Sequence, residues 1–203
     1  MPENRKKTGN RRFLNRVFTL EEQEAIGRAD RPDAMLWALW AGKEGAYKAL
    51  CKLDPLVVSI PKLYQVRYLT QIETTDAGPR WSGIADTPGG PVALEVVLAT
   101  DYVHCLAMAG GSTLHGRAIN GVTFQIIDVS DDADASIILR RAVAGHIAGR
   151  MKLAPSDIEI HRAQVEKGLG PPYVLIGGKP TDMDISLSHD GRYGAFAVCC
   201  RAK

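Results

Sequence analysis

Residues 37–50 read WALWAGKEGAYKAL, an alanine- and leucine-rich run that carries three charged side chains. The composition predicts a helix from about Asp33 to Leu53, because the following Asp54-Pro55 favours a stop. A helix of this kind is typical of a protein core. Its lysines and its glutamate therefore need an explanation.

Five side chains of this helix follow the spacing i, i+3, i+4, i+7 and i+8 and so share one face: Trp40, Lys43, Glu44, Tyr47 and Lys48. One interpretation is a boundary face with buried rings and a surface pair between Glu44 and Lys48, which contributes only about 0.3–0.5 kcal/mol. The other is an anion and metal site, in which the carboxylate holds a hard cation and the lysines meet phosphate oxygens. Spacing alone leaves both interpretations open.

The overall composition is that of an ordinary soluble protein. The chain has 203 residues, 45% of them hydrophobic, and a formal net charge of +2, which does not indicate a nucleic-acid-binding protein. It contains no run of about 18 apolar residues that could span a membrane. The four cysteines form no CxxC pair and the first dozen residues are not apolar, so we expect a cytoplasmic protein without a signal peptide.

The two halves of the chain share an order of parts: a helix, a strand, a Gly/Pro-rich loop and a pair of strands. The first half has AGKEGAYKALCKLDP, YQVRYL and VALEVVLATDYVHCLAMA, and the second has AGHIAGRMKLAP, DIEIHR and MDISLSHDGRYGAFAV. Few residues match, so the internal repeat is weak. We expect an α+β pseudo-dimer of two similar halves, residues 1–111 and 112–203, each with a helix packed on a small antiparallel sheet.

Three shorter segments carry further expectations. The basic opening MPENRKKTGNRR lacks periodicity and is expected to be an arm or loop, whose cations could attract an acidic partner. Thr19 and Glu22 form a capping-box pattern at the start of a helix that runs to about Ala29. The Gly/Pro-rich AGPRWSGIADTPGGP is expected to lead, as a loop, into the next strand.

The stretch DISLSHDGRYGAFAV, residues 184–198, alternates like a strand and then turns at a glycine. Ser188, His189 and Asp190 would lie at the strand end, either as a polar turn or as groups presented to a ligand. A nucleophilic triad is disfavoured, because adjacent strand side chains point to opposite faces. By the internal repeat, His104 would hold the place of His189 in the first half, and we expect it to be structural.

The W-x-x-K-E-x-x-x-K helix and the later S-L-S-H strand end together resemble the 4'-phosphopantetheinyl transferase superfamily. RRFLNRVFT and GLGPPYVLIGGKP are also similar to that family. The motif order resembles its holo-acyl-carrier-protein synthase branch, whereas the length and the two-half layout resemble its pseudo-dimeric, surfactin-type branch.

The resemblance implies transfer of 4'-phosphopantetheine from coenzyme A to a serine of an acyl or peptidyl carrier protein. The serine hydroxyl attacks the β-phosphate, 3',5'-ADP leaves, and Mg2+ bridges the pyrophosphate. The implied partners are therefore coenzyme A and a carrier protein, with neither nucleic acid nor membrane, and the chain would act as a monomer or a dimer.

The resemblance also implies roles for individual residues: Glu44 as a metal ligand that helps to deprotonate the serine, Lys48 at the pyrophosphate, Lys43 at the rim of the nucleotide site, Ser188 and His189 at coenzyme A phosphates, Asp190 as a base or orienting group, and Trp40 and Tyr47 as packing residues. His189 would lie near the 3'-phosphate. Asp190 stands where many family members have serine or threonine.

The sequence departs from the family pattern at its start. Members carry a G-x-D strand whose aspartate binds metal, and here no aspartate precedes Asp30. We expect either a chain that starts downstream of that strand or a member that has lost one ligand. The alternative function is a coenzyme A-binding or carrier-docking protein of the same fold with little catalysis. A nucleic-acid binder using the basic arm is disfavoured by the low net charge.

Overall fold

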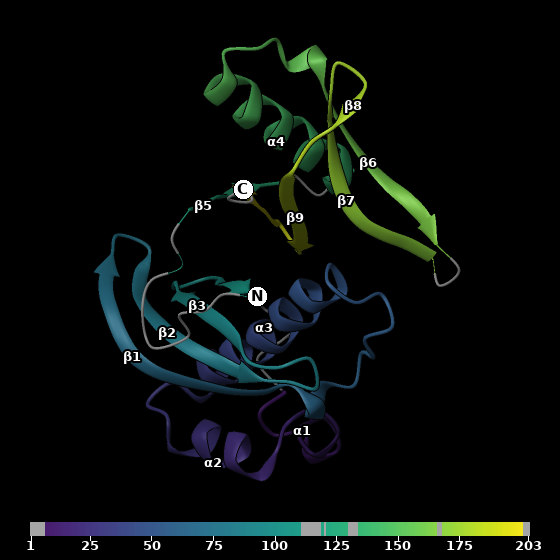
Figure 1. The fold of residues 1–203 in the computed structure, drawn as a ribbon. Coiled ribbons are helices and arrows are strands. Elements are labelled where there is room, and N and C mark those ends of the chain that lie inside the picture. Colours follow the sequence, from purple (N-terminus) through teal and green to yellow (C-terminus); the bar gives the residue numbers. More distant parts are fainter. Residues whose placement is uncertain (1–6, 111–118, 120, 130–133, 166–167, 201–203) are drawn as a thin grey trace. The chain divides into compact units, whose positions relative to one another are not determined.

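The computed structural model describes residues 7–110, 119, 121–129, 134–165 and 168–200. It divides into two compact units, Met1–Ile119 and Asn120–Lys203, coloured purple to teal and teal to yellow in Figure 1. The predicted boundary between residues 111 and 112 lies outside the described residues. Both units combine helices with antiparallel sheets, so the α+β class is confirmed.

The first unit opens with three helices, α1 (Arg11–Val17), α2 (Leu20–Arg28) and α3 (Pro32–Cys51). The expectation of a loop throughout residues 1–12 is wrong for Arg11 and Arg12, because the Asn10 side chain accepts a hydrogen bond from the Phe13 N–H and caps α1. None of the described helices is long and apolar enough to cross a membrane.

The predicted capping box is confirmed at the start of α2. The Thr19 hydroxyl accepts a hydrogen bond from the Glu22 N–H at 3.3 Å, and the Glu22 carboxylate accepts one from the Thr19 N–H at 2.8 Å. These two bonds satisfy donors that a helix start otherwise leaves without partners.

Four strands follow α3 in an antiparallel meander: β1 (Gln65–Thr75), β2 (Gly78–Asp86), β3 (Val92–Leu98) and β4 (Val103–Met108). A 3-10 turn, η2 (Pro61–Leu63), precedes β1. The loop expected at AGPRWSGIADTPGGP is wrong for residues 78–86, which form β2. Position 83 of this strand needs a glycine, because a Cβ there would lie 2.6 Å from the ring of Tyr68 on β1.

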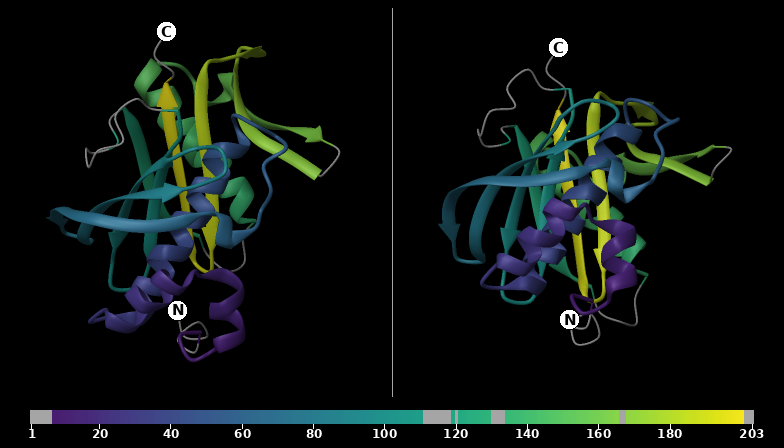
Figure 2. Two further views of the ribbon diagram at one scale, coloured as in Figure 1. Left: turned by 60° about the horizontal axis from the view of Figure 1, so that its bottom comes forward. Right: turned by 90° about the horizontal axis from the view of Figure 1, so that it is seen from below.

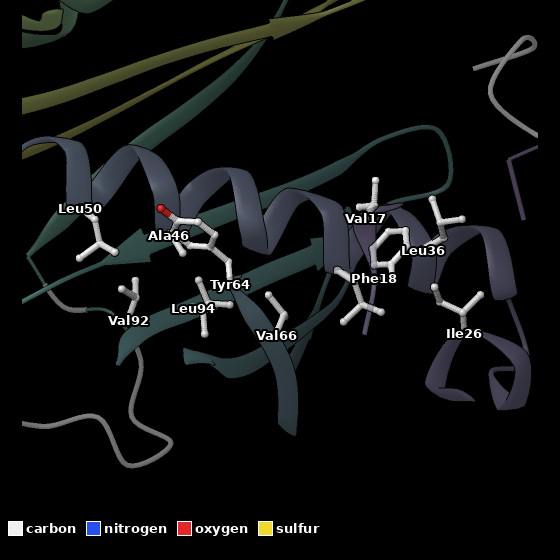
Figure 3. Close-up of a cluster of buried hydrophobic side chains, with 12 residues drawn as sticks. Val17, Phe18, Ile26, Leu36, Ala46, Leu50, Tyr64, Val66, Val92 and Leu94 are labelled. Carbon is white, nitrogen blue, oxygen red and sulfur yellow. The ribbon is translucent and has the colours of Figure 1, made fainter. Parts of the chain in front are cut away.

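Helix α3 lies against one face of this sheet (Figure 1, Figure 2). Two glycines allow the close approach. A Cβ on Gly42 would lie 2.9 Å from the Tyr68 hydroxyl, and one on Gly45 would lie 3.1 Å from the Ala107 Cβ. Figure 3 shows the apolar core between the helices and the sheet, which includes Phe18, Leu36, Leu50, Tyr64, Val66 and Leu94.

The second unit contains one long helix and two small sheets. Its elements are β5 (Val122–Asp128), α4 (Ala135–Met151), a 3-10 turn η3 (Pro155–Asp157), β6 (Ile158–Val165), β7 (Gly168–Ile176), β8 (Lys179–Pro180), β9 (Met183–Asp190) and β10 (Tyr193–Cys200). The sheets have the orders β5-β10-β9 and β6-β7-β8. Asp134 caps α4 through the Ser136 N–H, and the helix ends at Lys152 in the left-handed conformation (φ 56°).

The two units share an order of elements but differ in strand pairing. A helix, a 3-10 turn, a strand hairpin and two further paired strands follow one another in each. In the first unit β2 pairs with β3, whereas β7 and β9 contact each other but belong to different sheets. The pseudo-dimeric layout therefore stays a prediction, supported by the order of elements.

Candidate functional site

Lys43 lies in the buried stripe of α3, together with Leu36, Leu39, Ala46 and Leu50. Its side chain is only 2% exposed. Its ammonium group forms an ion pair with the Glu22 carboxylate at 2.7 Å and donates hydrogen bonds to the carbonyl oxygens of Tyr64 at 2.7 Å and Pro61 at 3.1 Å. These three acceptors match the three donors of an ammonium group.

The Glu22 carboxylate is equally engaged. Besides closing the capping box, it accepts a hydrogen bond from the Val66 N–H of β1 at 2.8 Å. Burial lowers the pKa of Lys43, and the hydrogen bond and charge of Glu22 oppose that shift. A place at the rim of a nucleotide site does not agree with these contacts, so we assign Lys43 a structural role that ties α2, α3 and β1 together.

Glu44 and Lys48 have a different environment from Lys43. Both side chains are half-buried, and neither has a hydrogen bond or an ion pair with a residue that the structure describes. The proposed surface pair between them is therefore not formed. A carboxylate and an ammonium group one turn apart on a rigid helix remain available to a ligand.

The aromatic residues of this helix pack, as expected. The Trp40 ring lies 6.3 Å from the ring of Phe13 on α1, and the Tyr47 ring meets that of Tyr64 edge-on at 6.0 Å. A hydrogen bond with Cys51, followed by burial and nearby negative charge that includes Glu44, raises the pKa of Tyr47 to about 12. Tyr47 is thus protonated at neutral pH and is not a base.

In the second unit, the three predicted residues are the last of β9. In the register with β10, Ser188 faces Ala195, His189 faces Gly194 and Asp190 faces Tyr193. A Cβ on Gly194 would lie 3.1 Å from Leu139 of α4. Because opposite residues of an antiparallel pair share a face, His189 lies on the α4 side of the sheet, and Ser188 and Asp190 lie on the other.

The three side chains also differ in exposure: Ser188 is half-buried, and His189 and Asp190 are exposed. The strand end thus presents an imidazole from one face, and a hydroxyl and a carboxylate from the other. A ligand that contacts Ser188 and His189 together has to reach around the strand end.

His104 lies near the start of β4 and is half-buried, and the burial of its ring lowers its pKa to about 4. The imidazole is therefore neutral at neutral pH. His104 comes after the turn between β3 and β4, whereas His189 comes before the turn between β9 and β10. The positional match expected from the repeat is wrong. Within the described part of the chain, no three His, Cys, Asp or Glu side chains gather as a metal site.

Sequence reasoning missed Glu22 as the partner of Lys43. The capping-box pattern placed Glu22 at the start of α2, but nothing in the spacing indicated that its second carboxylate oxygen reaches α3. The helix α1 was also missed. Its signal was the apolar set Phe13, Leu14 and Val17, which is interrupted by arginines and asparagine.

Comparison with known protein families gives a match over the first half of the chain. A family model described as the 4'-phosphopantetheinyl transferase superfamily matches residues 2–104, just over half of the chain. The matched segment includes Glu44 and Lys48 and does not reach β9. Neither the curated proteins nor the solved structures gave a match.

Proposed function

We propose a reaction from one premise, which is that the chain belongs to the 4'-phosphopantetheinyl transferase superfamily. The reaction is transfer of the 4'-phosphopantetheine group from coenzyme A to a serine of an acyl or peptidyl carrier protein, of the holo-acyl-carrier-protein synthase type. The observation that supports it is the pair Glu44 and Lys48, half-buried charges inside the matched segment that have no partner among the described residues.

In this reaction the serine oxygen attacks the β-phosphorus of coenzyme A, and the bond to 3',5'-ADP breaks. The serine proton leaves to a base, for which Glu44 is our candidate, directly or through water. Lys48 would meet the pyrophosphate oxygens, where an ammonium group offsets the negative charge that develops as 3',5'-ADP leaves. Lys43 takes no part, because its ammonium group is already bound.

The residues fit a magnesium ion that is held mainly by substrate. Mg2+ is commonly bound through one or two carboxylates together with substrate phosphates and water. Glu44 supplies one carboxylate, and the described residues offer no group of three protein ligands. When bound, Mg2+ would neutralise charge on the pyrophosphate. We propose Glu44 as its ligand from this chain.

For the second unit we propose coenzyme A contacts. The exposed imidazole of His189 would contact the 3'-phosphate, and the Ser188 hydroxyl would donate to a phosphate oxygen. Asp190 would orient its neighbours. These roles are proposed residue by residue from the family motif.

The test is the intact mass of an apo acyl carrier protein after incubation with the chain, coenzyme A and Mg2+. We expect a gain of one phosphopantetheine group, and we expect Glu44→Gln to abolish that gain without changing the fold. Glu24→Gln is the matched control, because Glu24 forms an exposed pair with Arg28 on α2. Normal transfer by Glu44→Gln would remove Glu44 from the reaction. His189→Ala should weaken coenzyme A binding, and an unchanged affinity would remove His189.

A second candidate function is a coenzyme A-binding or carrier-docking protein with little catalysis. It is favoured by the single carboxylate at Glu44, since no cluster of three ligands exists among the described residues. Binding of coenzyme A without any gain in carrier mass would support this function over the first.

A further inference from the structure

A pocket in the second unit combines two arginines with an apolar wall. It is lined by Arg140, Arg141 and Ala144 of α4, Pro155 of η3, and Ile158 and Ile160 of β6, and its volume is about 260 Å³. Helix α4 contacts both η3 and β6 (Figure 1). All the lining residues come from the continuous segment 140–160, so the pocket belongs to one unit and is formed by that unit alone.

The spacing of these residues explains why a pocket forms here. Ala144 lies four residues after Arg140 and three after Arg141, so its methyl group is the neighbour of both arginines on the helix surface. A side chain this small leaves room beside the two longer ones. Ile158 and Ile160 are two residues apart on a strand and therefore share one face of β6. The helix thus supplies the charged side of the pocket and the strand supplies the apolar side.

The two arginines lack a negative partner in the described part of the chain. Neither forms an ion pair or a hydrogen bond there. Arg140 is half-buried, and its Nε atom is buried without an acceptor. A guanidinium group is always charged in a protein, and a buried donor without an acceptor costs free energy. The fold therefore carries a cost at Arg140 that no described contact offsets.

The nearest acidic residues in the sequence do not supply this charge. Asp157 and Glu159 flank Ile158, and both are exposed. The Glu159 carboxylate lies 2.8 Å from the His161 imidazole nitrogen instead. Asp157 forms no ion pair with a residue that the structure describes. Negative charge for the two arginines therefore has to come from a bound molecule.

The chemistry of the pocket defines the class of molecule that fits it. The planar fork of a guanidinium group matches the oxygens of a carboxylate or a phosphate. The isoleucines favour an apolar body, because its burial removes apolar surface from water. A water molecule takes about 30 Å³ of the liquid, so the pocket has room for a molecule of roughly nine non-hydrogen atoms.

We propose that this pocket binds a small organic oxyanion, in which a carboxylate or phosphate head group is joined to a short apolar body. Arg140 and Arg141 hold the head group, and Ile158 and Ile160 contact the body. None of the residues proposed above for coenzyme A lines the pocket. The pocket is thus a second site, and the proposal does not depend on the proposed function.

The test is calorimetric titration of the full chain with hexanoate and with butyl phosphate, which share an apolar body and differ in head group. We expect saturable binding at one site, and the tighter of the two identifies the preferred head group. Hexanol and butanol lack the charge, and acetate and inorganic phosphate lack the body. Each should bind at least about tenfold more weakly than its parent compound.

Variants assign the binding to the two arginines. Arg141→Gln changes an exposed side chain, so circular dichroism should show an unchanged fold, and the dissociation constant should rise by about tenfold or more. Arg140→Gln should weaken binding at least as much. Arg162→Gln is the matched control, because Arg162 is exposed on β6, makes the same change in net charge and does not line the pocket. Its dissociation constant should equal that of the wild-type chain.

A melting experiment separates a binding role of Arg140 from a structural one. Arg140→Met removes the buried donor that has no acceptor, so without ligand it should melt at or above the temperature of the wild-type chain. A lower melting temperature would show that Arg140 stabilises the fold and would overturn its assignment to a binding site.

The titrations can overturn the proposal in several ways. It fails if neither hexanoate nor butyl phosphate binds saturably, or if the alcohols or the bare anions bind equally well. It also fails if Arg162→Gln weakens binding as much as Arg141→Gln does. Competition between coenzyme A and the bound compound would place the pocket within the coenzyme A site, and the proposal of a second site would be wrong.

Discussion

Replacing Lys43 by methionine should strongly destabilise the first unit. The change keeps the length and apolar character of the side chain but removes the ammonium group. It leaves the Glu22 carboxylate, which is 1% exposed, with two N–H donors and no cation. It also removes the Lys43 donor from the carbonyl oxygens of Tyr64 and Pro61, of which the Pro61 oxygen keeps a hydrogen bond from the Tyr64 N–H.

The magnitude follows from the cost of a buried charge that loses its partner. Breaking a buried ion pair from one side costs about 3–5 kcal/mol. A domain is stable by about 5–15 kcal/mol in total, so Lys43→Met removes a large share of the stability. Glu22→Gln should have a comparable effect. The double variant Lys43→Met/Glu22→Gln removes both charges. Its loss of unfolding free energy should therefore be smaller than the sum of the two single losses by at least about 1 kcal/mol.

Urea unfolding followed by tryptophan fluorescence measures this directly, because all three tryptophans of the chain, Trp37, Trp40 and Trp81, belong to the first unit. Arg28→Met provides the control, since its pair with Glu24 has a similar distance, 2.9 Å, but is exposed. That change should cost less than about 1 kcal/mol. A Lys43→Met variant as stable as the control, or single costs that add fully, would refute this reasoning.

Three further predictions concern stability. Gly42→Ala should destabilise the first unit by about 1–3 kcal/mol in urea unfolding, because the new Cβ would lie 2.9 Å from the Tyr68 hydroxyl. Gly27→Ala on α2, where nothing lies within 4 Å, should instead stabilise it by about 0.5–1 kcal/mol. Because the pKa of His104 is about 4 when folded and 6.5 ordinarily, the unfolded state binds more protons between these values. Stability should fall by about 3 kcal/mol as the pH drops from 6.5 to 4, and His104→Gln should lack this loss.

The sequence predicted best where a structural signal is local. The start of α2 followed from the spacing of Thr19 and Glu22, and most strands followed from their alternation. The strand β2 was missed because Gly78, Pro79 and Gly83 are typical of loops. The glycine at position 83 leaves room for the Tyr68 ring of another strand. No local sequence pattern can indicate such a contact.

The candidate site shows the same limit. Helical spacing placed Lys43, Glu44 and Lys48 on one face, although Lys43 belongs with the buried leucines. Adjacent residues of a helix differ by about 100° in direction, so a face drawn through both Lys43 and Glu44 is too wide to separate core from surface. The deciding contact, the carboxylate of Glu22, comes from another helix.

The Glu22 carboxylate also has a consequence for the solubility of the fold. Strand β1 is an edge of its sheet, since it pairs with β2 on one side only. An edge strand presents unpaired amides to which a strand of another molecule can add, the first step of edge-to-edge aggregation. The Val66 N–H is such a group, and Glu22 occupies it. The residue that neutralises the buried lysine thus also closes one position on this edge to a foreign strand.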